Sequence, residues 1–138
     1  MWCKRTELQG NSLDLLWGNV AANAQAIVKA GGACSARALD FNEVYMGEKL
    51  VYDFGEGAKV IVLGADVLYL ETVGPFTNLV IGLFQVKRNL TFYLAWKPRD
   101  LESESNFFKV LEQNRVVFTL LAEMDEHKIM VGKSMSVE

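Results

Sequence analysis

The chain has 138 residues, a hydrophobic fraction of 51%, and a formal charge of −3 at pH 7 with a pI near 5.2. A chain of this length can bury a core of its own, so we expect a single domain over residues 1–138. The acidic balance argues against a nucleic-acid-binding surface. No apolar run approaches the roughly 18 residues that a membrane helix needs, so no membrane partner is expected.

The first element that the sequence predicts is a long helix over 12–30. Its first serine is a suitable N-cap, and the Gly31-Gly32 pair ends it. An apolar stripe at helical spacing runs along the segment, which predicts that Trp17 is buried in the core. Residues 1–10 are open between a short edge strand and a tail without regular structure.

Two strands are expected before the centre of the chain. Apolar and polar side chains alternate over 33–41 and over 49–54, and this alternation is typical of strands with one buried face. The Gly55-Glu56-Gly57 sequence then favours a turn into the next strand.

The central stretch 59–97 carries most of the β-branched and aromatic side chains of the chain. Three groups of turn residues interrupt it, which favours four consecutive antiparallel strands. These groups are Gly64-Ala65-Asp66, Gly74-Pro75 and Lys87-Arg88-Asn89. Trp96 falls on the apolar face of the last strand and is expected in the core. The third strand is apolar on both sides, which indicates a central position in a sheet covered on both faces. The four expected strands are 59–63, 67–72, 78–86 and 90–97.

A polar segment after Trp96 leads into a short second helix ending near Asn114. A final hairpin is expected over 116–134, turning at Asp125-Glu126. The predicted fold class is therefore α+β. An N-terminal helix packs on a curved, mainly antiparallel sheet of about six to eight strands, with a short second helix before the C-terminal hairpin.

Motifs that carry metal or nucleotide chemistry are absent from the sequence. Cys3 and Cys34 do not form a Cys-x-x-Cys pair, and the single histidine, His127, cannot complete a zinc site with them. No phosphate-binding glycine loop, EF-hand spacing or nucleophile motif is present. We therefore expect no metal and no cofactor, and whether the chain is an enzyme stays open.

The candidate site consists of polar side chains on the predicted central strands. Small-molecule sites are commonly apolar surfaces that carry a few converging polar groups. A buried carboxyl group on such a surface can act as a general base, and Glu71 and Asp53 are the catalytic candidates. Glu71 is also explained as a strand end that faces water. The ligand-binding candidates are Tyr69, Glu71, Gln85, Thr91 and Tyr93.

The sequence favours a homo-oligomeric binding or assembly module, a homodimer that holds a small apolar ligand between helix and sheet. The strands over 59–86 are apolar on both faces, and exposed apolar patches usually mark contact surfaces. One alternative is a small general acid–base enzyme, similar to an isomerase or dehydratase. A second alternative is a subunit that binds another protein through the apolar sheet face. The N-terminal segment is a poor fit to a signal peptide, which favours a cytoplasmic location.

Overall fold

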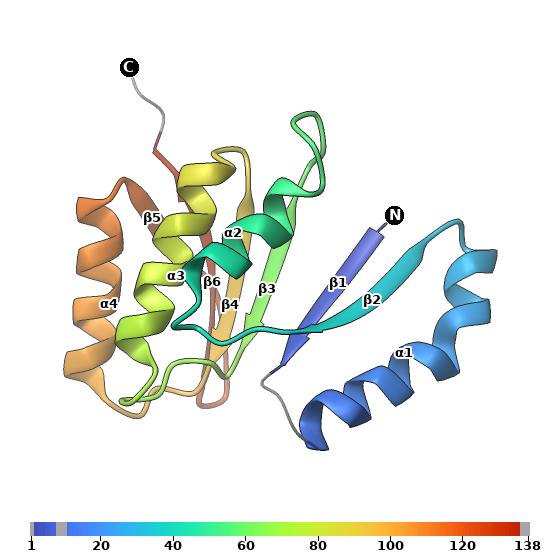
Figure 1. Ribbon diagram of the computed structural model, residues 1–138. Coiled ribbons are helices and arrows are strands. Elements are labelled where there is room, and N and C mark those ends of the chain that lie inside the picture. The colour runs from blue at the N-terminus through green and yellow to red at the C-terminus, as the bar shows by residue number, and fades with distance from the viewer. Residues whose placement is uncertain (1, 8–10, 136–138) are drawn as a thin grey trace. The chain divides into compact units, whose positions relative to one another are not determined.

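The computed structural model describes residues 2–7 and 11–135 (Figure 1). The chain divides into two compact units, an N-terminal unit over Met1–Glu43 and a C-terminal unit over Val44–Glu138. The single domain expected over 1–138 stays a prediction.

The N-terminal unit is a β-α-β arrangement. Strand β1 (Trp2–Glu7) pairs in parallel with strand β2 (Ala33–Ala38), and helix α1 (Asn11–Lys29) connects them. The predicted N-terminal helix is thus confirmed. The helix ends at Lys29, and Gly31 follows with a left-handed φ of 74° that allows the N–H groups of residues 31 and 32 to bond back to carbonyls of the last turn. Of residues 1–10, 2–7 form the strand, and the prediction for the others lies outside the described residues.

The predicted burial of Trp17 is wrong. Its side chain is 49% exposed, and α1 has no buried residue. The physical reason is that a two-stranded sheet offers too little surface within this unit to cover the stripe of a 19-residue helix.

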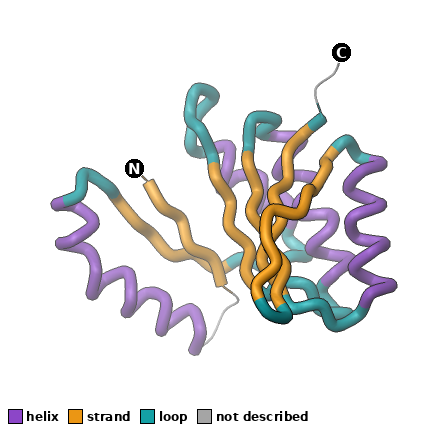
Figure 2. The backbone as a smooth tube through the Cα atoms, turned by 180° about the vertical axis from the view of Figure 1, so that it is seen from behind, coloured by secondary structure: helices purple, strands orange, loops and turns teal. Residues whose placement is uncertain are grey.

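The C-terminal unit is built on a mixed four-stranded sheet rather than the predicted mainly antiparallel sheet of six to eight strands. The strand order is β3-β4-β6-β5, with β3 and β4 parallel and β6 antiparallel to both of its neighbours. Three helices cover one face of this sheet (Figure 1), and the view from behind shows the strands in front of them (Figure 2). The elements are α2 (Val44–Tyr52), β3 (Ile61–Ala65), α3 (Val73–Val86), β4 (Thr91–Trp96), α4 (Leu101–Gln113), β5 (Val116–Met124) and β6 (His127–Ser134).

The core lies between β4 and the helices. Phe92, Leu94 and Trp96 alternate along β4 and are all buried, which confirms the predicted strand and its apolar face. Aromatic rings fill the space under α3 and α4: the rings of Phe76 and Phe107 are stacked with centroids 5.8 Å apart. Such ring pairs add to the free energy gained from burial alone.

The strand predicted over 78–86 is wrong, because these residues belong to helix α3. An apolar run that is buried on all sides fits a helix as well as a central strand, and periodicity does not separate the two. Helix α3 buries seven residues, among them Leu79, Val80 and Phe84. Pro75, which suggested a break, lies in the first turn, where a missing N–H leaves no hydrogen bond unmade.

Two further predicted strands are also wrong. Residues 49–54 lie mostly in helix α2, and residues 67–72 form a loop and turn that lead into α3. No hairpin turns at Gly64-Ala65, since both residues lie within β3. The segment 87–89 connects α3 to β4, and the Lys87 ammonium is buried there, donating to the carbonyls of Gly55 and Glu56.

The predicted second helix and C-terminal hairpin are confirmed. Helix α4 is longer than expected because the Asp100 carboxylate caps it, accepting from the N–H groups of Glu102 at 3.2 Å and Ser103 at 3.4 Å. The hairpin of β5 and β6 turns at Asp125, which has a left-handed φ of 53°. Strand β6 lies between β4 and β5, so β5 forms the edge of the sheet on that side.

Candidate ligand site at the carboxyl ends of β3 and β4

Strands β3 and β4 are parallel, so both end at the same edge of the sheet. In open α/β sheets, ligands bind in the crevice outside the carboxyl ends of the strands. Asp66 follows β3 directly, and its backbone N–H donates to the carbonyl of Ala95 at 2.7 Å. Its φ of 54° is left-handed, a conformation that aspartate tolerates better than most residues. The chain therefore holds a carboxylate at the carboxyl edge of β3 and β4.

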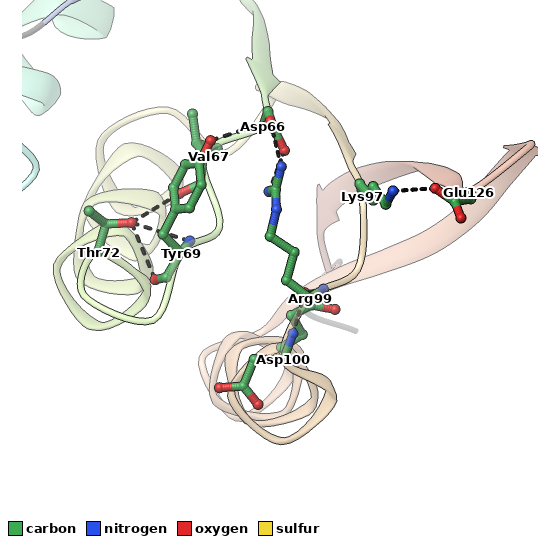
Figure 3. Close-up of polar contacts among 9 residues, drawn as sticks. Asp66, Val67, Tyr69, Thr72, Lys97, Arg99, Asp100 and Glu126 are labelled. Atoms are coloured by element: carbon green, nitrogen blue, oxygen red, sulfur yellow. Dashed lines mark hydrogen bonds and ion pairs between the residues drawn. The ribbon is translucent and has the colours of Figure 1, made fainter.

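Three side chains meet at this edge (Figure 3). Arg99 pairs bidentately with Asp66, with Nη1 2.7 Å from Oδ1 and Nη2 3.0 Å from Oδ2. The Tyr69 hydroxyl donates to Asp66 Oδ2 at 3.3 Å. The guanidinium carbon of Arg99 lies 5.0 Å from the centre of the Tyr69 ring. A cation is thus held between a carboxylate and an aromatic face.

Local backbone structure positions the aromatic side of this site. The Tyr69 carbonyl accepts from the N–H groups of Thr72 at 3.0 Å and Val73 at 2.8 Å, which closes the turn before α3. The Tyr69 N–H also lies 3.3 Å from the Thr72 hydroxyl oxygen, to which it donates. The turn therefore fixes the backbone of Tyr69, from which the ring extends, and helix α3 follows directly after the turn.

The backbone of Arg99 is fixed by the start of α4. Its N–H donates to Glu104 Oε1 at 2.9 Å, and the N–H of Asp100 donates to the same oxygen at 3.4 Å. Glu104 is only 7% exposed, so this contact is shielded from water. The side chain of Arg99 is 42% exposed. The backbone of Arg99 is therefore held at the start of α4, and its partly exposed side chain reaches from there to Asp66.

The ion pair determines the charge of the site. The hydrogen bond from Arg99 holds the pKa of Asp66 below its usual range, and Asp66 in turn raises the pKa of Arg99. Both groups are therefore charged at neutral pH. Because both side chains face water, screening by solvent and salt leaves the pair a small contribution to stability. Such a pair can exchange one partner for another.

A second ion pair lies on the same edge. Lys97 follows β4 and pairs with Glu126 in the turn between β5 and β6 (Figure 3). The hydrogen bond from Lys97 lowers the pKa of Glu126. This pair connects β4 to the hairpin turn, and the backbone N–H of Lys97 also contributes to lowering the pKa of Asp66.

Of the ligand-binding candidates from the sequence, the structure brings Tyr69 into this cluster. Glu71 lies two residues further on, exposed in the turn before α3 and not on a strand. Thr91 and Tyr93 are half-buried on β4, on the side opposite the buried face. Gln85 is exposed in the last turn of α3. The five candidates do not form one cluster.

Asp53 is exposed just after α2 and pairs with Lys49 at 3.2 Å, a typical pair at helical spacing. The residues that sequence reasoning missed are Asp66 and Arg99. Each follows a strand and was interpreted as part of a turn or polar exit. The two residues carry opposite charges and follow consecutive strands. Had those strands been predicted to be parallel, the two charges would have been expected at the same edge of the sheet.

A comparison with models of known protein families finds no match for this sequence. Function is therefore inferred from the geometry and chemistry of the site. Within residues 2–7 and 11–135, no three His, Cys, Asp or Glu side chains are grouped as metal ligands. In the same part of the chain, no helix has both the length and the apolar character needed to cross a membrane.

Proposed function

We propose that the C-terminal unit binds a small organic cation at the carboxyl ends of β3 and β4. The observation that supports this proposal is the position of the Arg99 guanidinium, between the Asp66 carboxylate and the Tyr69 ring. A ligand guanidinium or ammonium can make the same ion pair and the same cation–π contact. Arg99 then acts as an internal competitor that leaves the site when a ligand enters.

Replacing the Arg99 guanidinium by a ligand cation at Asp66 should cost little free energy. The Arg99 backbone stays bonded to Glu104 whether or not its guanidinium contacts Asp66. The side chain only has to rotate into water, where its charge is well solvated. Ligand affinity therefore depends on the difference between two similar sets of contacts, and it is modest in the wild type.

The test is a titration of the protein with methylguanidinium and with ethylammonium, followed by NMR shifts of the backbone amides of residues 65–70. Asp66→Asn should weaken binding about tenfold or more, since it removes the charge from the only carboxylate of the cluster. Arg99→Gln should instead strengthen binding several-fold, because it removes the competitor. Glu126→Gln is the matched control and should leave the affinity unchanged. Weaker binding in Arg99→Gln would contradict the proposal.

The pH dependence provides a second readout. Binding requires ionised Asp66, so affinity is constant at neutral pH and is lost as the pH falls through the pKa of Asp66. In Arg99→Gln that pKa should return towards about 3.9, so the loss should begin at a higher pH than in the wild type. An affinity that does not change with pH in either protein would show that another group binds the cation.

We also propose that two copies of the chain associate through the sheet face that the helices leave open. Residues on β4 alternate, so the face away from Phe92 and Leu94 carries Tyr93. The register places Leu63 beside Tyr93 on β3 and Val131 beside it on β6. Leu63 is 76% exposed. A contiguous apolar face of this kind is rare on monomers and is most commonly buried in two-fold dimers.

Light scattering coupled to size exclusion tests the dimer. The wild type at micromolar concentration should have twice the 15.4 kDa mass of one chain. Leu63→Glu should reduce the mass to that of a monomer, because two buried carboxylates would face each other across the seam. Leu101→Glu, at a position on α4 that is 74% exposed, is the matched control. A wild-type monomer at this concentration would overturn the proposal.

Other functions expected from the sequence stay predictions. Glu71 and Asp53 are both exposed and lie outside the strands, so neither has the position on a sheet surface that the acid–base prediction assumed. A small apolar ligand between helix and sheet, a different protein on the sheet face and a cytoplasmic location are likewise proposals without a specific supporting contact.

A further inference from the structure

A cavity of 260 Å³ lies at the other end of the C-terminal unit, near the start of β4. Its walls come from the last turns of α3, the turn between α4 and β5, and the end of β6. The apolar residues of its lining are Ile81, Phe84, Val116 and Met135. Asp66, in contrast, lies beside Ala95 at the carboxyl end of β4, so this cavity is separate from the cation site.

The lining of the cavity also includes two arginines, Arg88 and Arg115. Gln85 and Asn114 add amide groups beside them. Within residues 2–7 and 11–135, neither guanidinium forms an ion pair with a carboxylate. Among the described residues, the lining therefore combines two arginines and neutral polar side chains with apolar ones, and it includes no carboxylate.

The backbone at Arg115 departs from its usual preference. Its φ of 63° is left-handed, at the position after a helix where glycine is most common. The conformation is fixed on both sides: the Arg115 N–H donates to the carbonyl of Glu112 at 2.9 Å, and its carbonyl accepts from Met135 at 2.8 Å. A bulky residue kept in an unfavourable conformation at a cavity supports a role for its side chain.

We propose that this cavity binds a small carboxylate with an apolar body, about the size of phenylacetate. An apolar cavity of about 150 Å³ is large enough for benzene, so 260 Å³ accommodates an aromatic ring with a short acidic arm. The ring contacts the apolar wall around Phe84. The carboxylate pairs with Arg88 and Arg115, whose planar donors match its two oxygens. The ligand carries the opposite charge from that of the cation site.

Titration with phenylacetate, followed by the backbone amides of residues 84–88 and 113–116, tests this inference. The shifts should saturate, and acetate or benzyl alcohol alone should bind about tenfold more weakly, since each lacks one half of the ligand. Arg88→Gln and Arg115→Gly should each weaken phenylacetate binding about tenfold. Lys109→Gln is the matched control, because it removes one positive charge at an exposed position of α4.

Arg115→Gly also separates binding from a structural role. Glycine accepts a left-handed φ without strain, so this variant should melt at the same or a higher temperature than the wild type. If Arg115 served only to interact with the end of the α4 dipole, the variant would lose stability and keep its affinity. Equal affinity in Arg88→Gln, Arg115→Gly and the wild type would overturn the proposal. So would saturable binding of inorganic phosphate without binding of phenylacetate.

Discussion

Replacing Trp96 with alanine should destabilise the C-terminal unit by about 3–5 kcal/mol, the usual range for removing a large aromatic side chain from a core. Trp96 is 2% exposed at the end of β4, and its ring lies 5.4 Å from that of Phe108. Alanine would leave a cavity between the sheet and α4, and the fixed backbone of the strand could collapse into it only in part. Urea unfolding monitored by circular dichroism gives the free energy change.

Trp96→Phe is the informative control, because the indole N–H of Trp96 is buried without a hydrogen-bond partner within the described residues. Phenylalanine keeps most of the apolar volume and removes that donor, so the loss should stay below about 1.5 kcal/mol. A fall of less than about 1 kcal/mol in Trp96→Ala would contradict the packing described here. Fluorescence of Trp96 in a Trp2→Phe, Trp17→Phe background should also be that of a buried indole.

The parts of the fold that the sequence predicts correctly are those in which one pattern dominates. The strand at 91–96 alternates strictly, and the helix at 11–29 has an N-cap region, an apolar stripe and a terminating glycine pair. The C-terminal helix and hairpin have clear turn residues between them. In β4, α4 and the hairpin, local propensity and tertiary packing agree, whereas α1 follows its local signals although it buries no residue.

Helix α3 was predicted wrongly because its sequence satisfies both the strand pattern and the helix pattern. Val80 and Phe84 lie on one side of a strand pattern, while Leu79 and Leu83 lie on the other, and a helix buried on most of its surface has the same composition. Predicting a strand at 78–86 also led to the wrong, antiparallel sheet topology. Four consecutive strands require hairpins, and hairpins make every neighbouring pair antiparallel.

The candidate site was missed for the same reason. A helix between β3 and β4 makes those strands parallel and places their carboxyl ends at one edge. Only then do Asp66 and Arg99, 33 positions apart, come within hydrogen-bonding distance. Tyr69 could be proposed from its chemistry alone, but its partners depended on strand direction. A single helix assignment therefore decides both the topology and the site.

Gly132→Ala should destabilise the C-terminal unit by about 1–3 kcal/mol, the range for inserting a carbon atom into a packed core. In the sheet, Gly132 lies opposite Phe92 on one neighbour and Phe118 on the other. The Phe118 ring covers the glycine, and a Cβ there would lie 2.7 Å from Cε1 and closer still to other ring atoms. The ring of Phe118 would have to shift, which would disturb its packing against the rings of Phe92 and Phe108, whose centroids are each 5.8 Å from its own.

Gly74→Ala provides the matched comparison, because a Cβ added to Gly74, in the first turn of α3, meets no atom within 4 Å. That change should stabilise the unit by about 0.4–1 kcal/mol, since alanine restricts the unfolded chain and favours the helix. Urea midpoints of the two variants should therefore move in opposite directions from the wild type. Combining Gly132→Ala with Phe118→Leu should recover part of the loss, because leucine can move aside where the ring cannot. If Gly132→Ala alone kept the wild-type midpoint, the ring of Phe118 would not lie over Gly132.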